Sequence, residues 1–194
     1  MARRSRLGLV AAGMGVVLLA ACGGGASSKA ANPKTSEVNP AGDIPDTQAF
    51  VDYSSPSGVF TIKVPEGWAQ SAIGDGAVFA DKFNTIRIES AAGVPQPTVA
   101  SDKATEVHDL QAATPGFPIG KISTVTRPAG SSVLVSYGAD SAPDAVTGKT
   151  VRLDVERYEF WKNGMQVTIT VSSPVGADNV DPWKTITSSL TWLP

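Results

Sequence analysis

The sequence predicts an α+β fold in which an antiparallel β-sheet of about six to seven strands is flanked by two main helices. Three observations favour this class. Apolar and polar residues alternate along several short stretches, the stretch 98–113 repeats apolar residues at helical spacing, and Asn163-Gly164 separates two long strand-like runs. Strands interrupted by only two helical stretches indicate packed layers of sheet and helix.

The first half of the domain contains three predicted strands. Apolar and polar residues alternate in 60–64, and Pro65-Glu66-Gly67 ends that stretch with residues typical of turns. Ile86 and Ile88 are expected to face the core, and the charged residues beside them are expected to face solvent. The three predicted strands are 60–64, 77–80 and 85–90.

A long helix is predicted over 98–113, between Pro97 and Thr114-Pro115-Gly116. The acidic and lysine side chains of this stretch, Asp102 among them, are expected on the solvent face. The apolar positions that recur at helical spacing are Ala100, Ala104, Val107 and Leu110.

Two further strands, 121–127 and 132–137, precede the hairpin around Asn163-Gly164. This pair favours a two-residue type I′ turn, because both of its positions need positive φ. Such a turn fixes the strand register. The expected cross-strand pairs are Lys162 with Met165, Trp161 with Gln166, Phe160 with Val167, and Tyr158 with Ile169.

The strand that enters this hairpin has apolar residues at both odd-numbered and even-numbered positions. Leu153 and Val155 are odd-numbered, whereas Tyr158 and Phe160 are even-numbered, so one sheet face cannot hold both pairs. We predict a β-bulge near Glu156–Arg157 that resets the alternation. Without a bulge, both faces of this strand must be covered.

The C-terminal stretch predicts a helix of roughly nine residues packed on the sheet. Asp181 is expected to be the N-cap and Pro182 the first helical residue. Trp183, Ile186 and Leu190 then form one apolar stripe.

Two of these stretches resemble a known family. "YSSPSGVFTIKVPEGW" (53–68) and "PWKTITSSL" (182–190), together with the antiparallel strands between them, resemble the Mog1/PsbP-like fold. More narrowly, the chain is similar to actinobacterial lipoproteins of the LpqN/LpqT kind over about residues 50–194. The resemblance implies a non-enzymatic envelope protein, acting as a binding or accessory module in cell-envelope biogenesis. It places no binding residue.

The N-terminus predicts a lipoprotein signal peptide at 1–21, with three arginines followed by an apolar stretch too short to span a bilayer. Leu19-Ala20-Ala21-Cys22 resembles the bacterial lipobox, which implies cleavage before Cys22 and its modification with a diacylglyceryl group and acyl chains such as palmitate. The alternatives are a plain secretory signal or a buried free thiol. Because Cys22 is the only cysteine, it cannot form an intramolecular disulfide. We therefore expect a lipid anchor on the extracytoplasmic face of the cell membrane.

Residues 22–48 are poor in aromatic residues and rich in Gly, Ala, Ser, Asn and Pro, which predicts a disordered tether. Residues 49–194 are expected to form a single globular domain. Without the three arginines of the signal, 13 of the 16 basic side chains remain against 18 acidic ones. This acidic balance argues against a nucleic acid partner.

Catalytic and metal-binding motifs are sparse, and we predict neither an enzyme nor a cofactor or metal site. His108 is the only histidine and lies in the predicted helix, with no Gly-x-Ser-x-Gly motif to supply a nucleophile. Asp140 and Asp144 offer oxygen ligands to calcium, but their spacing matches no helix-loop-helix calcium site, and an acidic solvent loop is the favoured reading.

Aromatic residues of the hairpin are the candidate ligand or partner surface. Trp161 is expected on the opposite sheet face from Tyr158 and Phe160, where it either packs under a helix or lines a groove. The first functional hypothesis is a membrane-anchored, non-catalytic binding or accessory module with an envelope protein partner. The alternative is a carrier or chaperone for a hydrophobic envelope lipid, and a hydrolase is the least favoured reading.

Overall fold

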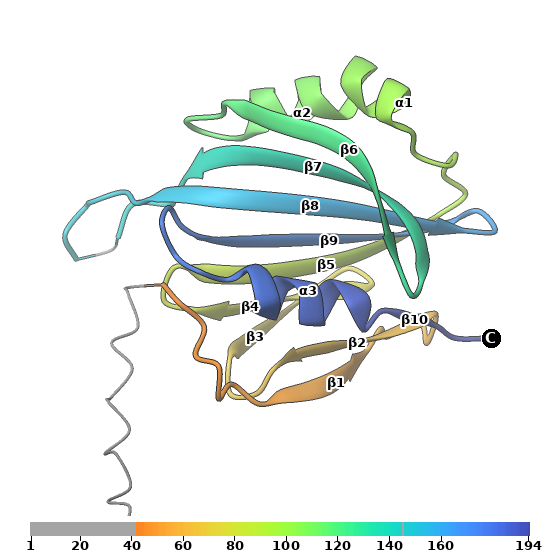
Figure 1. The fold of residues 1–194 in the computed structure, drawn as a ribbon, viewed down its shortest axis with the longest axis horizontal. Helices are drawn as coiled ribbons and strands as arrows, with labels where there is room; N and C mark the ends of the chain where they lie inside the picture. The colour runs from red at the N-terminus through yellow and green to blue at the C-terminus, as the bar shows by residue number, and fades with distance from the viewer. Residues whose placement is uncertain (1–41, 145) are drawn as a thin grey trace, which may run out of the picture. The chain divides into compact units, whose positions relative to one another are not determined.

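The computed structural model describes residues 42–144 and 146–194, and this part of the chain forms two antiparallel sheets and three helices (Figure 1). The larger sheet has seven strands, and its edge strands are β3 and β6. In spatial order the strands are β3 (Ala69–Ile73), β4 (Gly76–Asp81), β5 (Asn84–Ala92), β9 (Met165–Pro174), β8 (Arg152–Lys162), β7 (Gly130–Asp140) and β6 (Ile119–Arg127). The predicted α+β class is confirmed.

A second, smaller sheet was not anticipated as a separate layer. It consists of β1 (Phe50–Ser54), β2 (Phe60–Pro65) and the short β10 (Thr191–Trp192), with β2 in the middle. The predicted strand 60–64 therefore belongs to this sheet. Its buried residues Phe60, Ile62 and Val64 face the main core, as the alternation predicts.

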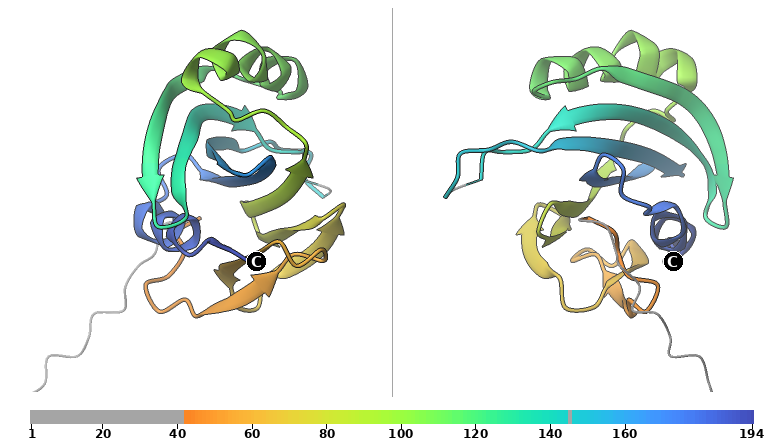
Figure 2. Two further views of the ribbon diagram at one scale, coloured as in Figure 1. Left: turned by 90° about the vertical axis from the view of Figure 1, so that its right-hand side faces the viewer. Right: turned by 60° about the vertical axis from the view of Figure 1, so that its left-hand side comes forward.

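The helices lie on opposite sides of the large sheet (Figures 1 and 2). α3 (Val180–Ser188) and the small sheet lie on the inner side of the curved sheet, whereas α1 (Val99–Ala104) and α2 (Glu106–Ala113) lie on the outer side. The main core fills the inner side. It includes Ile86, Ile88, Val167, Ile169, Val171 and Phe160 from the sheet and Trp183, Ile186 and Leu190 from the C-terminal segment.

The hairpin between β8 and β9 has the predicted register. Tyr158 pairs with Ile169, Phe160 with Val167, and Trp161 with Gln166. Asn163 and Gly164 have φ values of 51° and 82°, the left-handed conformation that a type I′ turn requires. The local turn chemistry therefore sets the pairing of two central strands.

The predicted β-bulge near Glu156–Arg157 is wrong. β8 pairs with both neighbours in unbroken register from Leu153 to Phe160. The opposite parities are accommodated because both faces of β8 are covered. Leu153 and Val155 pack on the outer face in a small second cluster that also contains Ala139, Tyr137 and Val151.

The long helix predicted over 98–113 is two helices that meet at Thr105, whose φ and ψ are −128° and −68°. Its expected apolar face is correct only in part, because Ala100 and Ala104 are exposed whereas Val107 and Leu110 are half-buried. The one buried residue of α1 is Asp102, which the helical periodicity placed in solvent. In α1 the apolar periodicity therefore does not predict which face is turned toward the sheet.

The C-terminal helix has nine residues, as expected, but begins two residues earlier than predicted. Asn179 rather than Asp181 precedes the helix, and Pro182 lies inside its first turn. The side chain of Asn179 makes no capping bond. It accepts from the backbone N–H of Ile44 at 2.7 Å and donates to the carbonyl oxygen of Gly42 at 2.9 Å.

The start of the described chain is thus fixed to the beginning of α3. Ile44 is buried in the main core, and Asp43 accepts a hydrogen bond from the backbone of Asp178. Residues 42–48, assigned to the tether from their composition, pack against the domain. Residues 1–41, which include the predicted signal peptide and Cys22, lie outside the described residues. Among the described helices, none is long and apolar enough to cross a bilayer.

Candidate binding cleft

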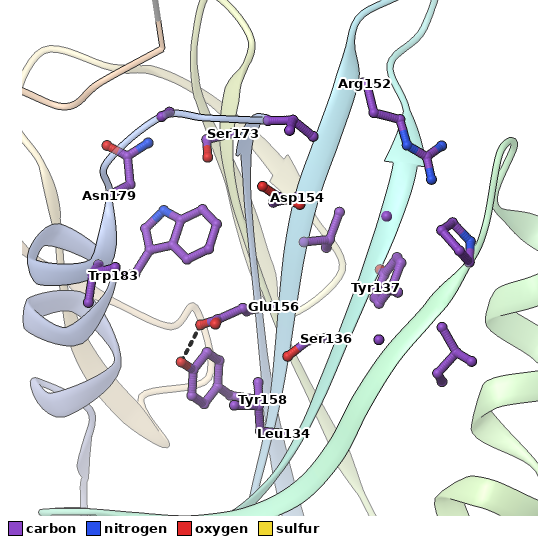
Figure 3. Close-up of a pocket in the computed structure, with 18 of the residues that line it drawn as sticks. Leu134, Ser136, Tyr137, Arg152, Asp154, Glu156, Tyr158, Ser173, Asn179 and Trp183 are labelled. Atoms are coloured by element: carbon purple, nitrogen blue, oxygen red, sulfur yellow. Dashed lines mark hydrogen bonds between the residues drawn. The ribbon is translucent and has the colours of Figure 1, made fainter. Parts of the chain in front are cut away.

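A cleft of about 830 Å³ lies between α3 and the inner face of the large sheet (Figure 3). β7 and β8 form its floor, α3 forms one wall, and the start of β6 forms the other. A volume of this size lies within the range of small-molecule sites, roughly 300–1,000 Å³. Even-numbered residues of β7 and β8 point into it, since alternate residues of a strand face the same side.

Aromatic side chains line one part of the cleft. Trp183 projects from α3 toward the strands, and Tyr158 rises from β8 (Figure 3). The guanidinium carbon of Arg127, at the end of β6, lies 5.6 Å from the centre of the Tyr158 ring, a cation–π arrangement. These residues give the cleft flat apolar faces beside charged groups.

Polar groups line the adjoining part of the floor. Glu156 accepts a hydrogen bond from the hydroxyl of Tyr158, and Asp154, Ser136 and Ser173 lie further along the strands (Figure 3). Burial raises the pKa of Tyr158, and the hydrogen bond to Glu156 raises it further because a phenolate there would face a carboxylate. The hydroxyl therefore stays a donor, and Glu156 keeps a fixed position.

The rim of the cleft is apolar. Ile119, Val175 and Val180 line it, and all three belong to the exposed large hydrophobic residues of the described chain. The side chain of Val180 is the most open of the three, with 71% of its surface exposed. An apolar rim around a floor of hydroxyls and carboxylates fits a molecule or peptide with both apolar and polar groups.

Arg152 closes part of the cleft beside the rim. Its guanidinium donates to Asp140 at 3.0 Å, and it packs so close to Gly138 and Gly116 that a Cβ at either glycine would meet it at 2.4 Å. The glycine at position 138 in β7 thus makes room for a cation above the strand. Asp140 is a partner of this arginine within the described structure, rather than half of a loop calcium site.

The residues considered for catalysis and metal binding do not converge on the cleft. His108 is exposed on α2, on the outer side of the sheet. Asp144 accepts from the backbone N–H groups of Val146 and Thr147 and so closes its own loop. Within residues 42–144 and 146–194, no group of three or more His, Cys, Asp or Glu side chains has metal-site geometry.

Comparison with known proteins identifies structures of similar fold. No protein-family model matches the sequence, and no curated protein matches it. The cyanobacterial PsbP (CyanoP) of Synechocystis sp. PCC 6803 matches with a TM-score of 0.51 and 13% identity, over 80% of this chain and 99% of that one. The Ran-binding protein Mog1p of Saccharomyces cerevisiae matches with a TM-score of 0.50 and 12% identity, over 75% and 96%.

The chain has the Mog1/PsbP-like fold. LpqN, which is involved in cell envelope biogenesis of Mycobacterium tuberculosis, is also similar, with a TM-score of 0.44 and 15% identity over 80% of this chain and all of that one. A longer chain from Bacteroides thetaiotaomicron is matched over 48% of its length. The fold implied by the sequence resemblance is therefore confirmed for this Mog1/PsbP-like domain.

The three aromatic residues proposed from the hairpin occupy three different environments in the Mog1/PsbP-like domain. Tyr158 lines the cleft, Phe160 lies in the main core with 1% of its surface exposed, and Trp161 lies on the outer face. The indole N–H of Trp161 donates to the carbonyl oxygen of Val94 at 2.9 Å. The three residues therefore do not form one surface.

Sequence reasoning missed Glu156 and Arg127 as cleft residues. The parity of Glu156 was available as a signal, because it shares its sheet face with Tyr158. Trp183 was predicted only as part of an apolar helical stripe. No sequence signal brings Arg127 to the cleft, because that depends on the curvature with which the β6–β7 hairpin reaches α3 (Figure 2).

Proposed function

We propose that this chain is a membrane-tethered, non-catalytic binding module of the cell envelope, and that the cleft beneath α3 is its binding site. The single observation that carries the proposal is the cleft itself, with aromatic and polar groups on its walls and floor and an exposed apolar rim. A domain with a filled interior and a polar surface would offer no comparable site.

The predicted location supports the envelope assignment. The lipobox-like sequence that ends in Cys22 would attach the chain to the membrane by its N-terminus. Two acyl chains suit this role, because one chain alone gives only marginal membrane binding. LpqN, a protein similar in structure, is involved in cell envelope biogenesis.

The distribution of chemical groups supports a non-catalytic role. The only histidine, His108, lies on the opposite side of the sheet from the cleft. Inside the cleft, Tyr158 and Glu156 are bonded to each other, and Arg152 is paired with Asp140. Such paired groups orient a ligand rather than attack it. Mog1p, which has the same fold, is a Ran-binding protein, so this fold is able to carry a binding role.

A second candidate function is favoured by the apolar rim. Ile119, Val175 and Val180 would contact the acyl part of an amphipathic lipid, while Asp154 and Glu156 would hold its polar part. The protein would then be a carrier or chaperone for an envelope lipid. The protein-binding and lipid-carrying functions use the same cleft and differ in the occupant.

Site-specific photocrosslinking in intact cells tests both functions. A photoreactive amino acid replaces Val180 at the cleft rim, and a matched control replaces Val51, an exposed apolar residue of β1. Adducts are then identified by mass spectrometry. We expect abundant adducts from position 180 and few from position 51, with protein adducts for an accessory module and lipid adducts for a carrier.

Equal labelling from positions 180 and 51, or none from either, would contradict the assignment of the cleft. A variant of the cleft gives a further test. Lys184→Glu places a negative charge on the exposed cleft face of α3 and is expected to reduce adducts at position 180 severalfold without unfolding the domain. A hydrolysed or otherwise altered molecule among the products would argue for an enzyme.

A further inference from the structure

The layer formed by α1 and α2 covers the outer sheet face in an unusual way. Helices normally attach to a sheet by burying an apolar stripe. Here α2 has no buried residue, and the only buried residue of α1 is Asp102. Val99, Val107 and Leu110 are only half-buried, so the most deeply buried contact of this layer is the polar one at Asp102.

Asp102 meets a second buried acid. Its carboxyl group lies within hydrogen-bonding reach of Glu159 of β8, and only 4% of Asp102 and 3% of Glu159 is exposed. Ser101 donates to Oδ1 of Asp102 at 3.2 Å, but no donor from the described part of the chain reaches Oδ2. A proton held between the two carboxyl groups would supply the missing donor.

The surrounding charges leave an excess of carboxylates. Among residues 42–144 and 146–194, Arg157 of β8 is the one cation paired with these acids, and it bonds Glu106 of α2 at 2.8 Å and Glu159 at 2.9 Å. Asp102, Glu106 and Glu159 thus share a single guanidinium. The other charged or titratable groups facing this cluster are Asp109 from α2, Glu89 with its own partner Arg87 from β5, and Tyr137 from β7.

No lysine compensates this excess from the helix or the edge strand. Lys103 of α1 and Lys121 of β6 are exposed and line a separate pocket between the helices and β6. If every acid were ionised, two buried negative charges would remain without a partner, a costly state for a protein interior. One shared proton removes half of that excess.

We propose that Asp102 and Glu159 form a proton-dependent clasp, which holds the α1–α2 layer on the sheet while they share a proton and releases it when both ionise. The clasp lies on the opposite sheet face from the cleft and does not depend on the proposed function of the cleft. It gives the chain a device that responds to pH at its outer face.

The direction of the response follows from burial. Burial raises the pKa of Asp102, Glu106 and Glu159 in the closed form, because the charged forms lose hydration. The closed form therefore binds more protons than the open one. Closure is most stable below the ordinary carboxyl pKa of about 4 and weakens as the pH rises through the raised values.

Release would uncover a second pocket. It has a volume of about 400 Å³, and its lining includes Pro97, Thr98 and Ala100 on the helical side and Trp161 and Glu159 on the sheet. The indole of Trp161, half-buried in the closed form, would then become more exposed to solvent or to a partner. Because Trp161 lines this pocket, its indole N–H signal can report on release of the layer.

Hydrogen exchange at several pH values tests the clasp. Amide protection in residues 99–113, corrected for the intrinsic pH dependence of exchange, is measured from pH 5 to pH 9. In the unaltered protein we expect protection to fall as the pH rises, by about tenfold for each unit of pKa difference between the closed and open forms. Amides of α3 serve as the internal reference and should not change.

Two variants identify the acids responsible. In Asp102→Asn, an amide donor replaces the shared proton, so the layer should stay closed and its protection should depend much less on pH, with a remainder from Glu106 and Glu159. Glu159→Gln gives an independent test if the first variant folds poorly. Glu66→Gln, at an exposed position far from the clasp, is the matched control and should behave like the unaltered protein.

A second readout follows the indole N–H signal of Trp161 by nitrogen-15 NMR, which should shift with pH in the unaltered protein and shift much less in Asp102→Asn. The proposal is overturned if protection of residues 99–113 is the same at pH 5 and pH 9. It is equally overturned if both acid variants keep the pH dependence of the unaltered protein.

Discussion

The guanidinium group of Arg127 lies over the ring of Tyr158 and at the same time donates through Nε to the hydroxyl of Thr187 in α3, at 3.2 Å. One side chain at the end of β6 thereby joins the floor of the cleft to its helical wall. The indole N–H of Trp192 adds a second link, donating to the carbonyl oxygen of Ala129 in the same hairpin at 3.1 Å.

Replacing Arg127 by alanine is expected to loosen this corner of the cleft. The change removes a cation–π contact and a charge-assisted hydrogen bond, so the free energy of unfolding should fall by about 1–3 kcal/mol. Urea unfolding followed by circular dichroism measures it. Lys63→Ala, which removes a surface pair with Asp52, is the control and should cost less than about 1 kcal/mol. Equal losses for the two variants would contradict the bridging role.

Replacing Tyr158 by phenylalanine keeps the ring under Arg127 but removes the hydroxyl that donates to Glu156. At neutral pH we expect a loss of about 0.5–1.5 kcal/mol in the free energy of unfolding, the usual contribution of one hydrogen bond. Chemical denaturation at pH 7 measures the loss. A gain in stability would show that Glu156 does not need this donor.

The same variant should change the alkaline limit of stability. Because the folded-state pKa of Tyr158 is raised, its contribution is fully present below the ordinary tyrosine pKa of about 10 and is lost as the pH rises above it. Tyr53 and Tyr137 also have raised pKa values, so the variant should reduce the alkaline decline without abolishing it. Thermal melts between pH 8 and pH 11 compare the slopes, and identical slopes would contradict the assignment.

Replacing Asn179 by alanine should detach the start of the folded chain from α3. The backbone N–H of Ile44 would lose its acceptor while buried, which costs about 1–3 kcal/mol. Because the helix takes no capping bond from Asn179, α3 itself should persist. Hydrogen exchange is expected to rise at residues 43–48 and to stay unchanged at 183–188. A rise in α3 alone would contradict this account.

Replacing Cys22 by serine tests the predicted anchor. We expect the unaltered protein in the membrane fraction and the variant largely in the soluble fraction after export, because the sulfur that carries the lipid is absent. Mass spectrometry of the N-terminal peptide checks the modification directly. Retention of the variant in the membrane pellet after high-salt washing would contradict lipid anchoring.

Turn preferences and residue alternation correctly predicted the features of the fold that depend on neighbouring residues. Asn163-Gly164 fixed the hairpin register because its positive φ values leave few alternatives, and the alternation in β5 placed Ile86 and Ile88 correctly in the core. The same reasoning failed where two layers meet. The supposed bulge at Glu156–Arg157 was inferred from one face of β8, whereas the fold covers both.

The amino-acid sequence by itself determined the α+β class and the central hairpin, and it predicts a lipid anchor at Cys22, because each depends on residues that are close together in the chain. Only the tertiary structure decided that Asp102 is buried, that Arg127 reaches Tyr158 and Thr187, and that a cleft opens beneath α3. The physical reason is that burial and long-range contacts depend on the curvature of the sheet and on which layer covers each face. The periodicity of residues along one helix or strand reports neither the curvature of the sheet nor the layer that covers each face.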